Sequence, residues 1–255
     1  MAQLVKRKAF LGVTNIIRFN WHFYVLASLL FILMVFIARF SSIYILQQVS
    51  LIGAILILIS TSLSIFVSWY IYDFTNIYQL PFIKASGESF SIANFNAGFD
   101  EFSPVIKCKF PNASLDVFDF YNPARHTEIS VKRARKSIKP YPGTRIIDTN
   151  TFVPEADKYD TVFLIFSAHE IRDTKERITF LHLLETSLKA SGKIYVMEHT
   201  RNLANLVAFN LGSLHFYSDK SWKNCFMLAK LKVKRQYKLN PFINLYEVIA
   251  NDPTH

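Results

Sequence analysis

Carboxylates, histidines and one asparagine recur at regular places in the second part of the chain, each directly after a short apolar run. Asn96, Asp119 and Asp148 follow the first three of these runs, and His169 and His199 follow the next two. Carboxylates accept hydrogen bonds from hydroxyl and amino groups, and an imidazole titrates near neutral pH. These residue types suit the binding of a small polar ligand and a reaction that moves one proton.

The elements that must position these side chains follow from the hydrophobic periodicity. The pattern predicts strands over residues 90–96, 115–120, 144–147, 161–166, 193–197, 233–239 and 244–250, and helices over 100–109, 127–137, 175–189 and 220–231. The run 161–166 is continuously apolar, as expected of a central strand buried on both faces. Asn240-Pro241 makes a tight connection, so the last two strands should be antiparallel.

Alternation of strands and helices indicates an α/β fold with a doubly wound, mostly parallel, seven-stranded sheet and a closing antiparallel pair. Sheets of this kind bind ligands outside the carboxyl ends of their strands, where the polar residues above are placed. Asp119 lies 21 residues after Gly98, close to the spacing of about 20 residues that puts an acid over a bound ribose.

This arrangement resembles the class I S-adenosylmethionine-dependent methyltransferases, which have a Rossmann-like fold, over roughly residues 85 to 250. The resemblance implies that the cofactor S-adenosyl-L-methionine approaches the turn Asn96-Ala97-Gly98, and that Asp119, with Phe120 beside it, accepts hydrogen bonds from the ribose. It also implies that Asp148 and Thr149 lie near the adenine amino group, and that Ser167 begins the loop where the methyl group meets its acceptor.

The first turn departs from the family pattern. The family usually has several glycines after an acid, whereas here Asn96 stands in place of the acid and Gly98 is the only glycine of the turn. Asp100 and Glu101 would repel a cofactor phosphate at the following helix, which argues against dinucleotides; S-adenosylmethionine has no phosphate. A domain that has lost its cofactor would show the same turn, so an inactive binding or scaffold protein is the alternative. A membrane reductase is a more distant one, because no Tyr-x-x-x-Lys pair is found.

Methyl transfer needs an aligned acceptor and a group that takes one proton. His169 is the expected base, Glu170 could orient it, and His199 could contact the same substrate. The structural alternative for each histidine is a hydrogen bond to the backbone of a loop. Together with Glu198 these residues could also ligate a metal, but adjacent residues seldom point the same way from a strand end, so we expect no metal.

Two apolar runs occupy the first third of the chain, at residues 21–38 and 49–71, and neither contains Lys, Arg, Asp or Glu. Each is long enough to cross a bilayer as a helix of about 20 residues. We therefore expect a membrane anchor over residues 1–75 and a methyltransferase-like domain over 85–255. Ser60, Ser64 and Ser68 share one helix face, which should pack on the first span; a dimer seam would explain the same pattern.

The distribution of charge predicts the orientation of this hairpin. Lys6, Arg7, Lys8 and Arg18 precede the first run, whereas the connecting loop has only Arg39, so both chain ends should be cytoplasmic in a multi-pass protein of the cell membrane. The two cysteines of the chain are isolated from each other in the sequence and should be reduced.

The formal net charge of +10 is concentrated in residues 125–145 and 220–238. A basic cytoplasmic surface would be attracted to anionic lipid, and a solvated helix face is the plain alternative. No nucleic-acid-binding motif is found, so we expect no nucleic acid partner. Residues 203–217 are largely apolar and form either a substrate cap or a buried helix. The sequence thus predicts a membrane-anchored methyltransferase for a lipophilic small molecule.

Overall fold

The computed structural model describes residues 7–83, 90–125 and 129–251. Five sequence predictions fall wholly or partly outside these ranges, namely the anchor start at residue 1, Lys6, the domain start at residue 85, the helix start at Thr127 and the domain end at residue 255. The chain forms two compact units, which we call the hairpin unit and the sheet unit. The hairpin unit comprises Arg7–Thr75 and Leu203–Ser213, and the sheet unit contains Asn76–Asn202 and Leu214–His255.

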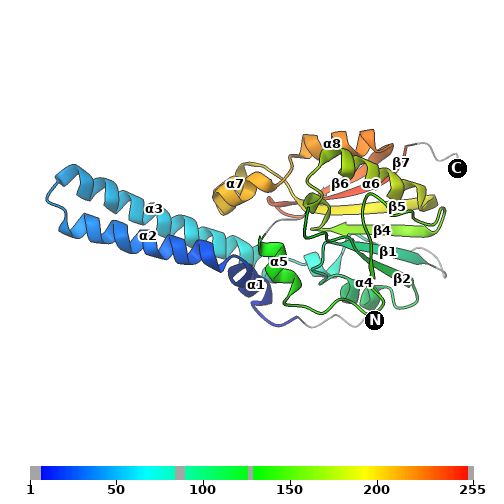
Figure 1. Ribbon diagram of the computed structural model, residues 1–255, viewed down its shortest axis with the longest axis horizontal. Coiled ribbons are helices and arrows are strands. Elements are labelled where there is room, and N and C mark those ends of the chain that lie inside the picture. The colour runs from blue at the N-terminus through cyan, green and yellow to red at the C-terminus, as the bar shows by residue number, and fades with distance from the viewer. Residues whose placement is uncertain (1–6, 84–89, 126–128, 252–255) are drawn as a thin grey trace. The chain divides into compact units, whose positions relative to one another are not determined.

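The hairpin unit is built on three N-terminal helices, α1 (Leu11–Phe19), α2 (Trp21–Phe40) and α3 (Tyr44–Trp69), followed by a π-helical turn at Tyr70–Phe74. Helices α2 and α3 pack along each other (Figure 1). Both are long and apolar enough to cross a membrane. The two apolar helices expected from the sequence are therefore present, and the second begins five residues earlier than predicted, at Tyr44.

Small side chains line the packed face of α3. Ser50, Ala54 and Ser68 are buried, and Ser60 and Ser64 are half-buried. A Cβ at Gly53 would lie 3.4 Å from Sδ of Met34 on α2. The serine stripe predicted from the sequence thus lies on the face where small residues allow two helices to approach closely.

The carboxylate of Asp73 holds the N-terminus of α1. Its two oxygens accept hydrogen bonds from the backbone N–H groups of Gly12 and Val13, each at 2.8 Å. These are first-turn donors that have no partner within the helix, so Asp73 acts as a cap supplied from the end of the second long helix. Gly12 is required there because a Cβ would lie 2.3 Å from Cβ of Tyr72.

Replacing Asp73 by Ala is expected to loosen α1 by about 1–2 kcal/mol, the usual cost of losing an N-terminal cap. Hydrogen exchange at the amides of Gly12 and Val13 should become about tenfold faster, with Asp73→Asn, which keeps one oxygen, intermediate. Unchanged exchange in Asp73→Ala would show that these two bonds do not hold the helix.

The sheet unit contains seven strands in the order β3-β2-β1-β4-β5-β7-β6. They are β1 (Ser91–Asn96), β2 (Ser114–Asp119), β3 (Arg145–Ile146), β4 (Tyr159–Ile165), β5 (Leu188–His199), β6 (Leu231–Lys238) and β7 (Ile243–Ala250). In Figure 1 the parallel strands β5, β4, β1 and β2 follow one another in this order. Strand β7 is antiparallel to β5 and β6. The predicted mostly parallel, seven-stranded sheet with a closing antiparallel pair is confirmed.

Helices cover this sheet and complete its core. The helices are α4 (Ser103–Lys109), α5 (Ile129–Arg135), α6 (Thr174–Thr186) and α8 (Asp219–Leu228), with short 3-10 turns at Ile77–Gln79 and Ala168–Glu170. A further 3-10 turn, Asn210–His215, lies mostly in the hairpin unit. Phe180 of α6 and Trp222 of α8 pack with Phe95 and Val162 from one face of the sheet. Asn94 points to the other face, where its side-chain amide donates to Oγ of Ser103 at the start of α4. The central strands are thus buried on both sides.

One boundary differs from the prediction for a steric reason. The sequence pattern predicts a helix over residues 175–189, but α6 ends at Thr186 and β5 begins at Leu188. A Cβ at Gly192 would lie 2.8 Å from the carbonyl oxygens of Lys189 and Tyr159. Gly192 therefore permits a close backbone approach at an irregularity between β4 and β5, and it does not terminate a helix.

Candidate functional site

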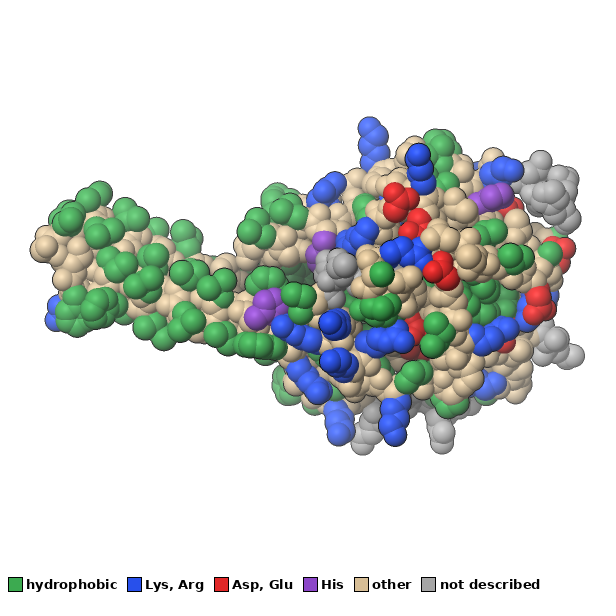
Figure 2. Space-filling view, viewed as in Figure 1, with side chains coloured by type: hydrophobic (Ala, Val, Ile, Leu, Met, Phe, Trp, Pro, Cys, Tyr) green, Lys and Arg blue, Asp and Glu red, His purple; other side chains and the backbone are tan. Residues whose placement is uncertain are grey.

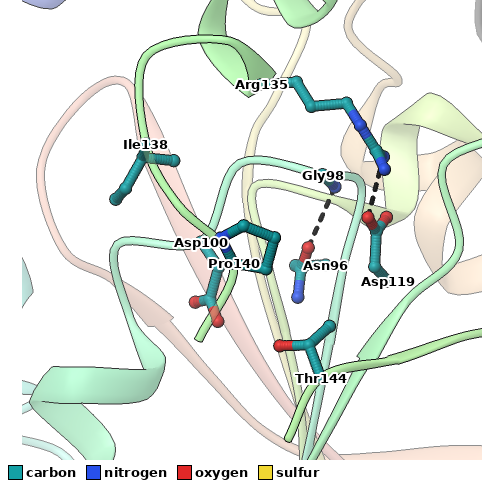
Figure 3. Close-up of a pocket in the computed structure, with 8 residues that line it drawn as sticks. All are labelled: Asn96, Gly98, Asp100, Asp119, Arg135, Ile138, Pro140 and Thr144. Atoms are coloured by element: carbon teal, nitrogen blue, oxygen red, sulfur yellow. Dashed lines mark hydrogen bonds and ion pairs between the residues drawn. The ribbon is translucent and has the colours of Figure 1, made fainter. Parts of the chain in front are cut away.

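A cavity of about 180 Å³ opens at the carboxyl ends of β1 and β2. Asn96 ends β1 and Asp119 ends β2, and the two residues are paired in the parallel register. This is the edge of the sheet at which an open parallel fold binds ligands. The lining residues, shown in Figure 3, are Asn96, Gly98, Asp100, Asp119, Arg135, Ile138, Pro140 and Thr144.

The first turn of the cavity is shaped by Asn96. Its side-chain oxygen accepts a hydrogen bond of 2.9 Å from the backbone N–H of Gly98 (Figure 3). Gly98 has φ +86°, a left-handed conformation that favours glycine. The side-chain nitrogen of Asn96 is buried and has no hydrogen-bond partner within the described chain. A single glycine suffices for this turn because the asparagine side chain closes it.

Asp100 presents one free carboxylate oxygen at the same cavity. Its Oδ1 accepts hydrogen bonds from the backbone N–H groups of Phe102 and Ser103 at 3.0 and 2.9 Å. Its Oδ2 is buried, and no described residue donates to it. Burial raises the pKa of this carboxyl group, and the hydrogen bonds from Ser103 and Phe102 oppose that shift. The cavity therefore holds an unpaired donor on Asn96 and an unpaired acceptor on Asp100.

Arg135 at the end of α5 reaches into the cavity from above (Figure 3). Its Nη1 lies 2.7 Å from Oδ2 of Asp119, and it is 2.6 Å from where a Cβ of Gly98 would lie. The guanidinium group also lies over the ring of Tyr121, at 4.8 Å from its centre. Burial raises the pKa of Asp119, while the N–H of Tyr121 and the charge of Arg135 oppose this shift. Arg135 thus fills the space between the glycine turn and the acid.

Three of the eight predicted cofactor residues line this cavity, namely Asn96, Gly98 and Asp119. Ala97 and Phe120 are buried beside them, and the hydroxyl of Ser167 donates to the carbonyl oxygen of Phe95 at 2.9 Å. These three side chains support the turn and the strand ends and do not line the cavity.

Asp148 and Thr149 belong to a neighbouring polar cluster. Asp148 pairs with Arg125, whose Nη1 also lies 2.9 Å from Oε1 of Glu176. The hydroxyl of Thr149 donates to the same Glu176 oxygen. The bond from Arg125 holds the pKa of Asp148 below its usual value. This cluster ties the loops after β2 and β3 to α6, so Asp148 has a structural partner in addition to the role that the resemblance implies.

His169 is held between two buried carboxylates. Its Nδ1 lies 2.7 Å from Oε2 of Glu198, and its Nε2 lies 3.0 Å from Oε1 of Glu170. Its backbone N–H donates to Oε1 of Glu198 at 3.2 Å. Burial lowers the pKa of His169, but the charges of Glu198 and Glu170 outweigh it and raise the value to about 10. The side chain is therefore an imidazolium at neutral pH and has no lone pair with which to accept a proton.

His199 lies on the neighbouring strand end, as expected, but in an aromatic setting. Its ring stacks on Phe216, with centroids 4.8 Å apart and planes at 13°, and also lies against Phe166. The ring of His169 meets the same Phe216 edge-on at 6.4 Å. The structure thus joins His169 directly to Glu170, and the rings of His169 and His199 both contact Phe216.

From the sequence, Glu198 was predicted only as a residue at a strand end and as a possible metal ligand, and Arg135 only as part of a basic stretch. Both are central to the observed geometry. Glu198 is the second-last residue of β5 and is buried. A buried carboxylate requires a partner, and His169 follows the neighbouring strand, so the contact between the two could have been inferred. Nothing in the local sequence separates Arg135 from the basic residues around it. Among the described residues, no group of three or more His, Cys, Asp or Glu is arranged to hold a metal ion.

Comparison with known proteins places this geometry in a fold family. No family model and no curated protein matches the sequence. A chain of the complex between the Haloferax volcanii Trm112 methyltransferase activator and a methyltransferase matches with a TM-score of 0.51, 11% identity, and coverage of 71% of this chain and 90% of that one. This chain has the class I methyltransferase fold. The predicted fold resemblance is therefore confirmed.

Two further structures are similar at lower scores. An S-adenosylmethionine-dependent methyltransferase from Aquifex aeolicus is 14% identical, with a TM-score of 0.47 and coverage of 64% of this chain and 85% of that one. Another, from Methanosarcina mazei, is 12% identical, with a TM-score of 0.47 and coverage of 64% and 92%.

Proposed function

We propose that this chain is an S-adenosylmethionine-dependent methyltransferase anchored in a membrane and acting on a lipophilic small molecule. The observation that carries the proposal is the cavity at the ends of β1 and β2. It presents an unpaired donor on Asn96, an unpaired acceptor on Asp100 and the acid Asp119 within one pocket. Buried polar atoms without partners are costly, so their gathering at one place indicates a ligand that satisfies them.

The chemistry of the cofactor fits these residues. Its ammonium group would suit the free oxygen of Asp100, its carboxylate would suit the amide nitrogen of Asn96, and its ribose hydroxyls would suit Asp119. It carries no phosphate for Asp100 to repel. When bound, it would supply a methyl group activated by a sulfonium. The cavity of about 180 Å³ is smaller than the 300 Å³ or so at which ligand pockets begin, so binding requires Arg135 to withdraw from Asp119.

His169 has a positioning role in this proposal and does not act as the base. Its ion pair with Glu198 joins the turn after β4 to the end of β5, and its ion pair with Glu170 lies within that turn. The acceptor's proton would then pass to water, which favours acceptors that are more acidic than an alcohol, such as phenols. Glu170 and Glu198 serve the same loop because each holds one nitrogen of the imidazolium.

The membrane anchor is supported by the exposure of the hairpin unit. In the helix Trp21–Phe40, no residue of the most apolar part is buried. In Tyr44–Gln79, only 11% of the most apolar part is buried. Core helices of a soluble protein would hide these side chains, and Figure 2 shows hydrophobic groups covering the hairpin. Exposed apolar helices of this length are stable in lipid. By the charge argument, both chain ends lie on the cytoplasmic side.

The first basic stretch suits an anionic membrane surface better than the second. Lys and Arg side chains gather over α5 in Figure 2, and each would be attracted to anionic lipid by about 1 kcal/mol near the surface. The second stretch includes Lys232, Lys234 and Lys238 on β6, which is an edge strand. Exposed lysines on an edge strand also prevent pairing with other chains, which explains them without a membrane.

A specific observation favours the alternative of an inactive scaffold protein. Arg135 already pairs with Asp119 and covers Gly98, so the protein itself supplies the partner that a cofactor ribose would otherwise supply to Asp119. An inactive protein of this kind would hold binding partners at the membrane, and its cavity would not bind a cofactor.

Calorimetric titration of S-adenosylmethionine and S-adenosylhomocysteine into the full chain in lipid nanodiscs distinguishes these functions. Asp119→Asn should weaken binding by about tenfold, since hydrogen bonds to a charged acceptor contribute about 1.5–3 kcal/mol and release of Arg135 offsets part of the loss. Asp116→Asn is the matched control, because Asp116 lies on the same strand but accepts from the hydroxyl of Tyr159 at 2.7 Å and does not line the cavity.

Binding that Asp119→Asn weakens and Asp116→Asn leaves unchanged would support the proposed site. Binding that neither variant weakens would place the ligand elsewhere. Absence of binding to the folded wild-type chain would favour the scaffold protein.

A further inference from the structure

Large apolar side chains project outward from the segment between β5 and α8. Leu203, Val207 and Leu211 are 75%, 53% and 79% exposed. The segment consists of α7 (Leu203–Phe209) and the turn that follows it. The sequence predicts either a buried helix or a substrate cap here, but a buried helix would hide these side chains, whereas they are exposed.

The polarity of this segment is the reverse of that of a helix on a soluble domain. Its inward positions are small or polar, with Asn205, Ala208 and Ser213 buried. Its outward positions are leucine and valine at spacings of three and four residues, which form one continuous face. A soluble helix normally places its large apolar residues inward and its polar residues outward. The outward face of this one therefore favours an apolar surrounding.

The segment belongs to the hairpin unit and not to the sheet unit that it interrupts in the sequence. Residues Leu203–Ser213 cluster with Arg7–Thr75, and α7 packs against α3, as Figure 1 shows. Its exposed leucines are therefore continuous with the exposed apolar surface of a helix that is long enough to span a bilayer. A surface that adjoins a lipid-facing helix has lipid as its nearest apolar surrounding.

The charges around the segment fit a position at the membrane boundary. No Lys, Arg, Asp or Glu occurs between Leu203 and Leu214, whereas exposed Arg201 precedes the segment and exposed Lys220 follows it. Apolar segments that lie in the interface plane are commonly flanked by basic residues, which remain among the lipid headgroups.

We infer that Leu203–Ser213 is a third membrane-contacting element, whose outward leucines insert into the boundary between headgroups and acyl chains of the bilayer that holds α2 and α3. This inference rests on the proposed membrane anchor. It deepens the proposed function because the segment begins four residues after the candidate substrate residue His199 in the sequence.

Spin labels on the full chain in phosphatidylcholine and phosphatidylglycerol vesicles test this inference. The label is attached to the cysteine of Leu211→Cys, in a chain in which Cys108 and Cys225 are changed to Ala. Circular dichroism checks that this variant folds. Collisions with O2, which concentrates in hydrocarbon, are compared with collisions with a water-soluble nickel chelate. Val153→Cys is the aqueous reference, since Val153 is an equally exposed apolar residue of the sheet unit at 82%, and Ile55→Cys, at 47% on α3, is the lipid reference.

The ratio of O2 to nickel collisions at Leu211 should exceed that at Val153 by at least about fivefold and approach that at Ile55. A ratio at Leu211 equal to that at Val153, with Ile55 in lipid, would overturn this inference and leave the anchor intact. An aqueous Ile55 would refute the anchor and the inference together. Protection of Leu211 from both reagents would also overturn the inference, because it would show that protein covers the segment.

A measurement on the unmodified chain makes the test independent of the cysteine variants. Photoactivation of a phospholipid that carries a diazirine on its acyl chain should attach lipid to peptides containing residues 203–214 and to those from α2 and α3. Labelling of α2 and α3 without labelling of residues 203–214 would contradict the inference.

Discussion

Raising the pH from 6.5 to 10 is expected to destabilise the sheet unit by about 3–5 kcal/mol through His169 alone. The folded pKa of His169 is raised from 6.5 to about 10 by Glu198 and Glu170 against the effect of burial. Between these two values the folded chain holds a proton that the unfolded chain releases, so the free energy of unfolding falls as pH rises. The contribution is complete below pH 6.5 and is lost by about pH 10.

Urea unfolding of the full chain in detergent, followed by the fluorescence of Trp222, measures this effect. Trp222 is the single tryptophan of the sheet unit, and it is buried in the core. In His169→Gln the fall in the free energy of unfolding between pH 6.5 and 10 should largely disappear. His182→Gln is the matched control, since His182 also lies beside a glutamate, with its Nδ1 3.3 Å from Glu185, but is partly exposed on α6.

If His169→Gln does not fold, the titration of the His169 ring in the wild-type chain by nuclear magnetic resonance gives the same information directly. A ring that titrates near 6.5 would contradict the two ion pairs as the basis of the shift. A slope that His169→Gln leaves unchanged would assign the pH dependence to other groups.

Arg135→Ala is expected to tighten binding of S-adenosylmethionine by ten- to a hundredfold, or about 1.4–2.7 kcal/mol. In the wild-type chain, ligand binding must separate Nη1 of Arg135 from Asp119 at 2.7 Å and move the guanidinium off the ring of Tyr121. An alanine removes both contacts and opens the space above Gly98, so that cost disappears. The affinity then rises because less of the binding energy is used to displace a side chain.

Lys132→Ala provides the control, because Lys132 is on the same helix and has the same charge but is exposed and does not line the cavity. Calorimetric titration should show little change for Lys132→Ala and tighter binding for Arg135→Ala. Weaker binding in Arg135→Ala would contradict displacement and show that the guanidinium contacts the ligand. No binding to either variant would support the inactive scaffold.

Much of the fold could be predicted from the sequence because the strands differ strongly in pattern from the segments around them. The continuous apolar run at residues 161–166 corresponds to β4, which lies centrally and is buried throughout its second half. The tight connection at Asn240-Pro241 was also informative. There the side-chain oxygen of Asn240 accepts from the N–H groups of Phe242 and Ile243 and turns the chain between β6 and β7.

The candidate site was predicted less completely because its geometry depends on side chains from distant segments. Asn96 and Asp119 could be found because each ends a strand. Arg135 enters the cavity only because α5 ends beside it, and that depends on tertiary packing, which no local pattern encodes. The protonation of His169 likewise depends on Glu198, which is distant in sequence but 2.7 Å away in space.

The interleaving of the two units along the chain has a practical consequence for dissection of the protein. No single cut separates them, because Leu203–Ser213 leaves the sheet unit after Asn202 and the chain returns at Leu214. A fragment that begins near Asn76 would retain this apolar segment and lose α3, the helix on which it packs. Such a fragment would aggregate through its own leucines. A soluble version needs a short polar linker in place of the segment as well as removal of the N-terminal helices.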